Sequence, residues 1–205
     1  EHSISPGAVA AVARDHPDLV LVQLDAHADL RQSWLGASHS HACAMRRCLD
    51  VLPSGDLLQI AIRSGTAEEF SELHRSGRLI PLHQMSQKLS DLRGRPIYLT
   101  VDLDWFDPAV MPGTGTPEPG GFTWADFAVL INELQHHHLV GADVVELAPQ
   151  LDPSGISSVL AAKVTRSLRE STKNAPDGHP KPIWKKHPKG LPKAHPKVTP
   201  HAKNS

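Results

Sequence analysis

The sequence predicts an α/β fold, a three-layer α/β/α sandwich with a mostly parallel sheet. Four apolar runs of strand length, rich in Val, Leu and Ile, alternate with segments of helical periodicity. Such uninterrupted runs are typical of strands that helices cover on both faces. Aromatic residues make up only 4% of the chain, so its core must consist mainly of aliphatic side chains. With 205 residues and 40% apolar content, the chain is long enough for one globular domain.

The expected helices and strands alternate along the chain. Ser5 and Pro6 form a helix cap and a first-turn residue, which predict a helix that ends near Asp15. The expected strands are 19–25, 57–62, 97–103 and 139–147. The expected later helices are 41–52, 66–77, 123–137 and 154–170. We place the three histidines 136–138 at a helix end, where imidazolium would complement the helix dipole.

Two features bear on the cellular compartment. No apolar run approaches the ~20 residues that a membrane-spanning helix needs, and the first residues lack a basic region followed by an apolar stretch. Cys43 and Cys48 lie five positions apart on an expected helix, where they do not face each other, so we expect packing residues and no disulfide. We therefore expect a cytoplasmic protein with no membrane partner.

Residues 173–205 differ in composition from the preceding domain at 1–172. They contain eight Lys, seven Pro and one Asp, and His-Pro-Lys recurs at 179, 187 and 195. Proline at this density excludes helix and central strand, and few apolar residues remain to offset the entropy of ordering, so we expect a disordered tail. The alternatives are a contact for acidic partners such as nucleic acid and a weak metal site through the histidines. Trp184 is the tail's one aromatic residue, so base stacking has little support and we expect no nucleic-acid partner.

Three of the expected strands end in acidic side chains. The residues at these ends are Asp25, His27 and Asp29, then Asp102 and Asp104, and finally Glu146. Alternate side chains of an extended chain point to the same side, and ligands bind beyond the carboxyl ends of parallel strands. Four Asp carboxylates cannot lie close together without neutralisation, which two divalent cations would supply. Oxygen donors with a minority of imidazole and no thiolate favour Mn²⁺ or a similar hard ion over structural Zn²⁺.

The short motifs are individually weak. Asp-x-Asp also occurs in glycosyltransferases, and Asp-x-His at a strand end also opens the metallophosphoesterase pattern, although the Gly-Asn-His segment of that class is not found downstream. The string VDLDWFDPAVMPGTGTPEPGG at 101–121 is far more specific. Its Gly and Pro residues specify a defined loop path at the strand tip, and we expect Asp107 to brace that loop.

The sequence resembles the arginase/agmatinase/ureohydrolase family, and most closely its agmatinase branch. The matching strings are EHS at 1–3, DAHAD at 25–29, SHACAMRR at 40–47, AIRSGTAEE at 61–69, the string at 101–121 and DVVELAPQLDPSG at 143–155. They span nearly all of residues 1–170. The region after Asp29, LRQSWLGASHSH, is closer to agmatinases than to arginases, because it lacks the Asn and Ser pattern with which arginases grip an α-amino acid.

The resemblance implies two Mn²⁺ ions per chain. One would be held by His2, Asp25, Asp29 and Asp102, and the other by Asp25, His27, Asp102 and Asp104, with Asp25 and Asp102 bridging. Glu146 would bind the substrate guanidinium, and His41 would shuttle a proton and contact the substrate, with His39 as the alternative. Asp104 is a second candidate for proton transfer. Arg63 would line the cleft or pair with a structural carboxylate.

The implied function is manganese-dependent hydrolysis of a small guanidino compound by a metal-bridging hydroxide. Because the resemblance is strongest to the agmatinase branch, it implies agmatine as the substrate, with putrescine and urea as products in polyamine biosynthesis. The substrates of arginase and guanidinobutyrase are the alternatives. Family members have a segment before the EHS string that would supply the first strand of the sheet, so the fold is expected to lack its N-terminal part. A catalytically impaired fragment that acts only through association with a partner is therefore the competing hypothesis, whereas a complete chain is expected to form a homo-oligomer.

Overall fold

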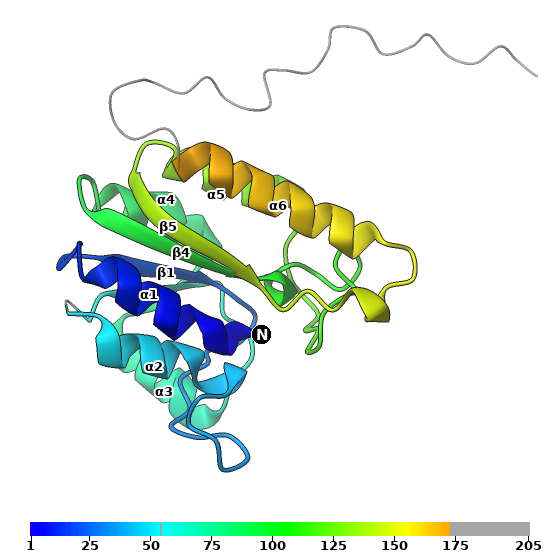
Figure 1. The fold of residues 1–205 in the computed structure, drawn as a ribbon, viewed down its shortest axis with the longest axis horizontal. Coiled ribbons are helices and arrows are strands. Elements are labelled where there is room, and N and C mark those ends of the chain that lie inside the picture. The colour runs from blue at the N-terminus through cyan, green and yellow to red at the C-terminus, as the bar shows by residue number, and fades with distance from the viewer. Residues whose placement is uncertain (54, 173–205) are drawn as a thin grey trace, which may run out of the picture.

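The computed structural model describes residues 1–53 and 55–172 and contains one sheet of parallel strands (Figure 1). The strand order is β3-β2-β1-β4-β5. The strands are β1 Val20–Leu24, β2 Leu57–Ile60, β3 Leu79–Ile80, β4 Pro96–Asp102 and β5 His138–Val145. The α/β/α fold that the apolar runs predict is confirmed. The tail at 173–205 lies outside the described residues.

Helices connect the strands, and two of them begin with a capping box. The α-helices are α1 Ser5–Ala13, α2 Ala44–Val51, α3 Ala67–Ser76, α4 Met85–Ser90, α5 Trp124–Leu134 and α6 Ile156–Thr172. Short 3₁₀ helices cover His2–Ile4, His41–Cys43, Leu82–Gln84, Leu103–Trp105 and Pro149–Leu151. Thr66 caps α3 and Thr123 caps α5, each in a capping box in which an acidic side chain three residues later accepts a hydrogen bond from the cap residue's backbone N–H. The prediction that Ser5 caps α1 is wrong, because Ser5 is the first residue of this helix and no side chain caps it.

One strand and one α-helix have no counterpart in the sequence prediction, and the predicted end of α5 is wrong. β3 has two residues and α4 has six, which is too short for a periodic pattern to stand out. α5 ends at Leu134, and His138 already belongs to β5. The three consecutive histidines therefore follow the helix and lead into the strand instead of ending the helix.

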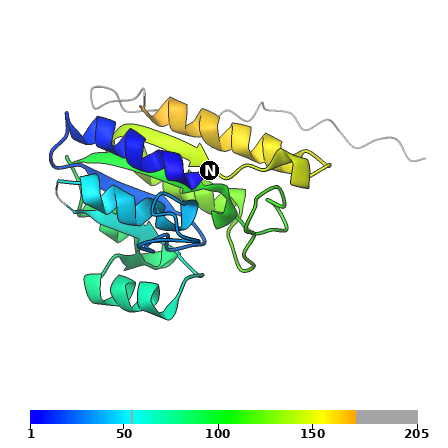
Figure 2. The same cartoon turned by 60° about the horizontal axis from the view of Figure 1, so that its bottom comes forward.

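Different helices cover the two faces of the sheet. α1, α2 and α3 pack on one face, where Val9, Met45 and Leu73 meet Leu21 and Tyr98. α4, α5 and α6 pack on the other face in a larger core of aliphatic and aromatic side chains. Figure 2 shows β5 passing between α1 and α6. Full burial of a Leu or Val side chain contributes about 1.5–3 kcal/mol, so these two cores hold the helices on the sheet.

The face toward α1 becomes polar near the carboxyl ends of the strands. Gln23 on β1, Gln59 on β2 and Thr100 on β4 are all fully buried. Alternation along a strand puts Gln23 on the same face as Leu21, and Thr100 on the same face as Tyr98. Because buried polar groups need hydrogen-bond partners, this face must carry a polar network beneath the strand ends.

A bulge in β5 decides which of its side chains join this polar face. The register with β4 shifts at Val140, so that Tyr98 pairs with Gly141 and Thr100 pairs with Asp143. Gly141 is needed opposite Tyr98, because a Cβ at this position would lie 2.7 Å from Cδ2 of the tyrosine ring. A slip of one residue would turn Asp143 to the opposite face of the sheet.

Two further observations concern the described residues. Within 1–53 and 55–172, no helix combines the length and the apolar character that crossing a membrane requires. Cys43 and Cys48 are both buried and free, as their spacing predicts. Cys48 belongs to the core on the α1 side of the sheet.

Candidate metal centre

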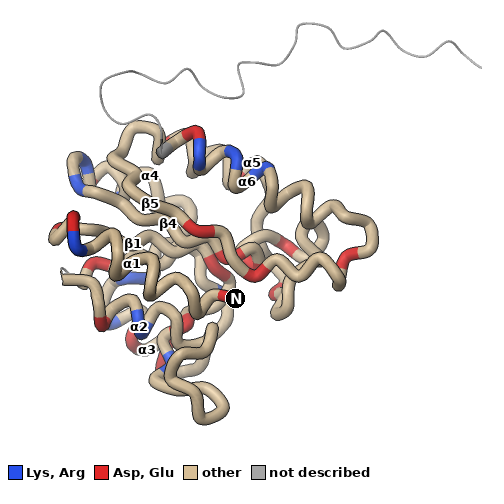
Figure 3. Tube along the Cα trace, in the orientation of Figure 1, with Lys and Arg blue, Asp and Glu red and all other residues tan. Residues whose placement is uncertain are grey.

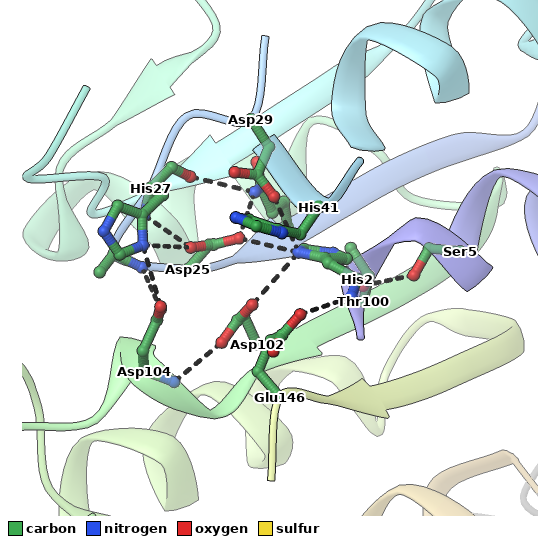
Figure 4. A network of polar contacts seen from close by, with 12 residues as sticks. His2, Ser5, Asp25, His27, Asp29, His41, Thr100, Asp102, Asp104 and Glu146 are labelled. Carbon is green, nitrogen blue, oxygen red and sulfur yellow. Dashed lines mark hydrogen bonds and ion pairs between the residues drawn. The ribbon is translucent and has the colours of Figure 1, made fainter. Parts of the chain in front are cut away.

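Histidine and aspartate side chains converge beyond the carboxyl ends of β1 and β4 (Figure 4). His2 Nδ1 lies 3.1 Å from Asp25 Oδ2, 3.0 Å from Asp29 Oδ2 and 3.2 Å from Asp102 Oδ2. All four side chains are buried. Figure 3 shows acidic residues gathered at this end of the sheet beside the N-terminus. We call His2, Asp25, Asp29 and Asp102 the His2 half of the centre.

A second group lies next to the first and shares Asp25 with it. His27 Nδ1 is 2.9 Å from Asp104 Oδ2 and 3.6 Å from Asp25 Oδ1. Asp25 therefore presents one carboxylate oxygen to His2 and the other to His27, as a bridging ligand would. The His27 side chain is 27% exposed, whereas Asp104 is buried. We call Asp25, His27 and Asp104 the His27 half of the centre.

Two sets of ligand atoms are close enough to hold a cation. The donor atoms of His2, Asp25 and Asp102 lie within 4.8 Å of one another, and so do those of Asp25, His27 and Asp104. Asp102 Oδ1 accepts a hydrogen bond from the backbone N–H of Asp104 at 2.9 Å. The structure therefore brings Asp102 to the first set, while its bridging role toward the second set stays a prediction.

The loops at the strand ends hold these side chains through backbone contacts. The backbone N–H of His27 donates to Asp25 Oδ1 at 2.6 Å, and that of Ala26 donates to Asp104 Oδ1 at 3.0 Å. Asp29 has a φ of 54° and Glu146 a φ of 64°, in the left-handed region that non-glycine residues seldom adopt. Such strained residues cluster at functional sites, where the surrounding structure holds them in place.

Two buried glutamines support the centre from within the sheet. Gln23 Nε2 donates to Asp25 Oδ2 at 2.7 Å, and Gln59 Nε2 donates to Gln23 Oε1 at 2.6 Å. Gln59 Nε2 also donates to the carbonyl of Ala28 at 2.8 Å. Neither glutamine is predicted from the sequence to support the site. A polar side chain at an inward position of an apolar run is the signal that could have identified them.

The charges of the centre shift the pKa values of its histidines. Burial lowers the pKa of His2, but Asp102, Asp25 and Asp29 outweigh this effect and raise it well above its ordinary value. Burial also lowers the pKa of His27, and Asp104 and Asp25 outweigh it to give a value of about 11. Both rings sit in a strongly negative field, which favours any cation that reaches them.

The pKa values of three of the four aspartates are also raised, which favours their neutral form. Burial and the charge of Asp25 raise the pKa of Asp29 to about 7. Burial and Asp25 also raise the pKa of Asp102 and of Asp104 above the ordinary range. For Asp25, burial raises the pKa, but the two histidines outweigh it and hold the pKa below its ordinary value. Carboxylates this close together retain protons unless a cation replaces them.

The donor set fits divalent cations. His2 Nδ1 is buried and has no hydrogen-bond partner, even though three carboxylate oxygens surround it. An unpartnered buried nitrogen is costly unless a ligand completes it. Carboxylate oxygens with one imidazole in each half suit Mn²⁺ or a similar hard ion, and no thiolate is present among these residues.

A cleft of about 270 Å³ opens beside the centre. Its walls are formed by His27, Ala28, Asp29, Arg31, Trp34, His41, Ala42, Ser64, Gly65, Glu69, Asp102, Asp104, Thr116 and Glu146. Glu146 Oε1 accepts the backbone N–H of His2 at 2.6 Å. The His41 side chain is 43% exposed and reaches the cleft, whereas His39 is exposed and does not line it. The structure thus brings both predicted substrate residues, Glu146 and His41, to the same cleft as the ligands.

The loop after β4 is held by Arg63 and Asp107. Arg63 donates hydrogen bonds to four backbone carbonyls, those of Asp104, Trp105, Glu118 and Pro119. Both roles expected for Arg63 are therefore wrong, since it neither lines the cleft nor pairs with a carboxylate. Asp107 Oδ2 accepts the backbone N–H groups of Gly120 and Gly121, each at 3.0 Å, and the prediction that Asp107 braces this loop is confirmed.

Three cleft residues were not found by sequence reasoning. Glu69 is buried, and its carboxylate accepts the backbone N–H groups of Leu30 at 2.9 Å and Thr66 at 2.8 Å. The Arg31 guanidinium lies 4.1 Å above the Trp34 ring and 3.7 Å from Glu69. The contacts of Glu69 with Leu30 and Arg31 join segments that are distant in sequence, so no local pattern predicts them, whereas the contacts with Thr66 and Trp34 are local.

Comparison with known proteins finds similar proteins that match most of the chain. The profile of the arginase family matches residues 1–169. The agmatinase of Bacillus anthracis is 37% identical over 174 residues, which cover 82% of this chain and 60% of that protein. The guanidinobutyrase of Pseudomonas aeruginosa is 33% identical over 178 residues, which cover 80% of this chain and 56% of that protein. The chain thus spans about 60% of the length of the first of these relatives.

Solved structures agree with the sequence comparison. The agmatine ureohydrolase of Thermoplasma volcanium is similar with a TM-score of 0.73 and 37% identity, covering 85% of this chain and 60% of that one. The arginase of Medicago truncatula is similar with a TM-score of 0.70 and 31% identity, covering 85% of this chain and 57% of that one. The similarity therefore extends over nearly all of the described residues.

Proposed function

Because the chain belongs to the arginase family, we propose that it hydrolyses agmatine to putrescine and urea with two bound Mn²⁺ ions. The observation that carries this proposal is a pair of ligand groups that share Asp25 and border the same cleft. His2, Asp25, Asp29 and Asp102 would hold one ion, and Asp25, His27, Asp102 and Asp104 would hold the other. We further propose that residues 1–172 form the catalytic domain.

The cations and the substrate carboxylate have separate roles in this proposal. When bound, the pair of cations activates water for attack near neutral pH. Glu146 binds the planar guanidinium through charge-assisted hydrogen bonds and orients its carbon toward the ligand groups. The backbone N–H of His2 fixes the Glu146 carboxylate at 2.6 Å, so this carboxylate is oriented before substrate arrives.

Proton transfer is assigned to residues at the rim and at the base of the cleft. His41 is partly exposed at the cleft wall, so its imidazole can take a proton from solvent and deliver it to the departing amine nitrogen. Asp104 Oδ2 accepts hydrogen bonds from His27 at 2.9 Å and from the Thr116 hydroxyl at 3.2 Å. We propose that this oxygen receives the proton that the attacking water loses.

The charge of the cleft supports a cationic substrate. Two divalent cations would neutralise the four aspartates of the centre, which leaves Glu69, Glu146 and Arg31 as the other charged groups of the cleft wall. Arg31 already lies beside Glu69 and over Trp34. Since Glu146 remains for the substrate and Arg31 is engaged, a diamine-like guanidinium such as agmatine fits better than a guanidino acid.

The similarity to guanidinobutyrase supports a second candidate substrate, 4-guanidinobutyrate. Arg31 is the group that could bind its carboxylate if it left Glu69. Comparing the two substrates on one variant distinguishes the candidates, because replacing Arg31 by Met would lower kcat/KM for guanidinobutyrate and leave that for agmatine nearly unchanged.

Urea release by the purified chain with Mn²⁺ tests the proposal. We expect kcat/KM to be highest for agmatine when compared with 4-guanidinobutyrate and arginine. Glu146→Gln should lower kcat/KM about 10- to 100-fold, the cost of losing a charged hydrogen-bond acceptor, with Mn²⁺ content unchanged. Binding of two Mn²⁺ ions without urea release from any of the three substrates would instead support the impaired fragment that acts through a partner.

A further inference from the structure

A chain of hydrogen bonds leads from His2 away from the ligand groups and into the sheet. His2 Nε2 lies 3.0 Å from the Thr100 hydroxyl, on the side of the ring opposite the aspartates (Figure 4). Thr100 Oγ1 donates to Asp143 Oδ1 at 2.6 Å. The Tyr98 hydroxyl donates to Asp143 Oδ2 at 2.9 Å. These three residues lie on the polar face of β4 and β5, and no ligand set includes them.

The direction of these hydrogen bonds fixes the proton on His2. A threonine hydroxyl has one hydrogen, and Thr100 uses it toward Asp143. The hydroxyl can therefore only accept a hydrogen bond from His2, so Nε2 of His2 carries a proton. The lone pair available for a cation is then on Nδ1, the atom that faces Asp25, Asp29 and Asp102.

We propose that Thr100 and Asp143 are positioning residues, which orient the His2 ring and hold its proton on Nε2 so that Nδ1 is free to bind a cation. The inference rests on the proposed function, because it assigns a role to these residues only if the His2 half binds metal. Groups behind a histidine ligand commonly set its tautomer and raise its basicity, and their loss weakens metal affinity about 10- to 100-fold.

The fold supplies Asp143 to this position by a specific device. The bulge at Val140 brings Asp143 opposite Thr100, and Gly141 leaves room for the Tyr98 ring to reach the same carboxylate. Burial and the charge of Asp143 raise the pKa of Tyr98 well above its ordinary value, so the phenol keeps its proton at neutral pH. Asp143 thus receives two hydrogen bonds that hold it in place behind His2.

A purely structural role is the competing explanation, since the same contacts satisfy buried polar groups between α1 and the sheet. Ser5 of α1 also lies 3.5 Å from the Thr100 hydroxyl. A structural role predicts lower thermal stability with unchanged Mn²⁺ affinity. A positioning role predicts weaker Mn²⁺ binding at one of the two sites, even where the protein stays folded.

Mn²⁺ titration of the full chain, followed by electron paramagnetic resonance, separates these roles. Two Mn²⁺ ions in neighbouring sites give a spin-coupled spectrum, whereas a single bound ion gives an isolated six-line spectrum. We expect Thr100→Val to weaken one Mn²⁺ about 10- to 100-fold and to leave an isolated signal at limiting metal. Asp143→Asn should have a smaller effect in the same direction, and it provides the test if Thr100→Val does not fold.

Two further variants serve as controls. Thr100→Ser retains the hydroxyl and should bind both ions within about threefold of the unaltered chain. Thr165→Val removes a hydroxyl that donates to the Ala161 carbonyl on α6, across the sheet from His2. It should leave the affinity for both Mn²⁺ ions unchanged.

The outcomes distinguish this inference from the function on which it rests. If the unaltered chain binds no Mn²⁺, the proposed function fails and the positioning role fails with it. If the unaltered chain binds two ions and both Thr100→Val and Asp143→Asn bind them with unchanged affinity, only the positioning role is overturned. Weaker binding of one ion in Thr100→Val, restored in Thr100→Ser, supports it.

Discussion

The His2 half and the His27 half of the centre share Asp25 but rest on different parts of the fold. The side chains of the His2 half are buried, and Gln23 of β1 and Thr100 of β4 hold them by hydrogen bonds. The His27 half is partly exposed and depends on the loop after β4, which Arg63 pins through backbone carbonyls. Rigid strands position ligands more accurately than loops do. We therefore expect the His2 half to bind its cation more tightly than the His27 half binds the other one.

If the two halves bind metal independently, Asp25 is not a shared ligand. Asp25→Asn tests this sharing and has the largest expected effect of the variants proposed here. Asp25 presents one oxygen to each histidine, so its loss should remove both Mn²⁺ ions together. We expect the metal content measured after dialysis to fall from about two ions per chain to near zero. Asp91→Asn, which alters an aspartate in a hydrogen bond with Gln87 on α4, is the matched control and should retain both ions. Retention of one ion by Asp25→Asn would show that the halves do not share this ligand.

Removing each histidine in turn shows which half is the stronger. His2→Ala should lower Mn²⁺ affinity by more than about 100-fold at one site, and loss of a buried ring should also destabilise the fold by about 2–3 kcal/mol. His27→Ala should weaken the other site while changing the unfolding free energy by less than about 1 kcal/mol, because this side chain is 27% exposed. Calorimetric titration and denaturant unfolding of the pair measure both quantities. Equal stability losses would contradict the proposed difference between the halves.

The sequence anticipates the ligands better than it anticipates their supports. Spacings of two at the strand ends and the long string at 101–121 place the aspartates and His27 in one region without knowledge of pairing, whereas His2 is predicted only through the resemblance to the family. The role of Thr100 depends on the bulge at Val140, which turns Asp143 toward it. Strand register is a tertiary property, and a side-chain pattern within one strand does not encode its partner.

The same limit explains why the contacts of Arg63 and Glu69 are not predicted from the sequence. Arg63 lies in a string that matches the family, but its four carbonyl partners become neighbours only when the loop after β4 folds back. Glu69 has a local signal, the capping box with Thr66, yet its contact with Leu30 crosses from α3 to another loop. β3 and α4 are too short to produce a pattern of their own.

The pH dependence of stability tests the raised pKa values in the His2 half. In the absence of metal, burial and Asp25 raise the pKa of Asp29 to about 7. A carboxyl whose pKa is higher in the folded than in the unfolded state binds more protons when folded, so its stabilising contribution is lost as pH rises from about 4 through about 7. The raised pKa values of Asp102, Asp104 and His27 act in the same direction over their own ranges.

We therefore expect the Tm of the metal-free protein to fall between about pH 5 and about pH 8, and Asp29→Asn to flatten this slope. Added Mn²⁺ should stabilise the unaltered chain more at the higher pH, because fewer protons must be displaced, and it should stabilise Asp29→Asn much less. Thermal unfolding with EDTA and with Mn²⁺ at the two pH values measures both effects. A metal-free Tm that rises over this window would contradict the assigned pKa direction.

Arg63→Lys has the smallest expected effect and tests whether the His27 half depends on the loop after β4. A guanidinium donates to four carbonyls in fixed directions, and a lysine ammonium with its shorter reach cannot satisfy them all. We expect a loss of about 1–2 kcal/mol in unfolding free energy and a threefold to tenfold weaker second Mn²⁺, roughly the cost of one or two unmade hydrogen bonds. Arg93→Lys, on the exposed turn after α4, is the matched substitution and should change neither quantity. Arg63 contacts the Asp104 carbonyl and no atom of the His2 half, so the first Mn²⁺ should bind with unchanged affinity. An equal loss of Mn²⁺ affinity at both sites would mean that the loop after β4 and the sheet do not support the two halves separately.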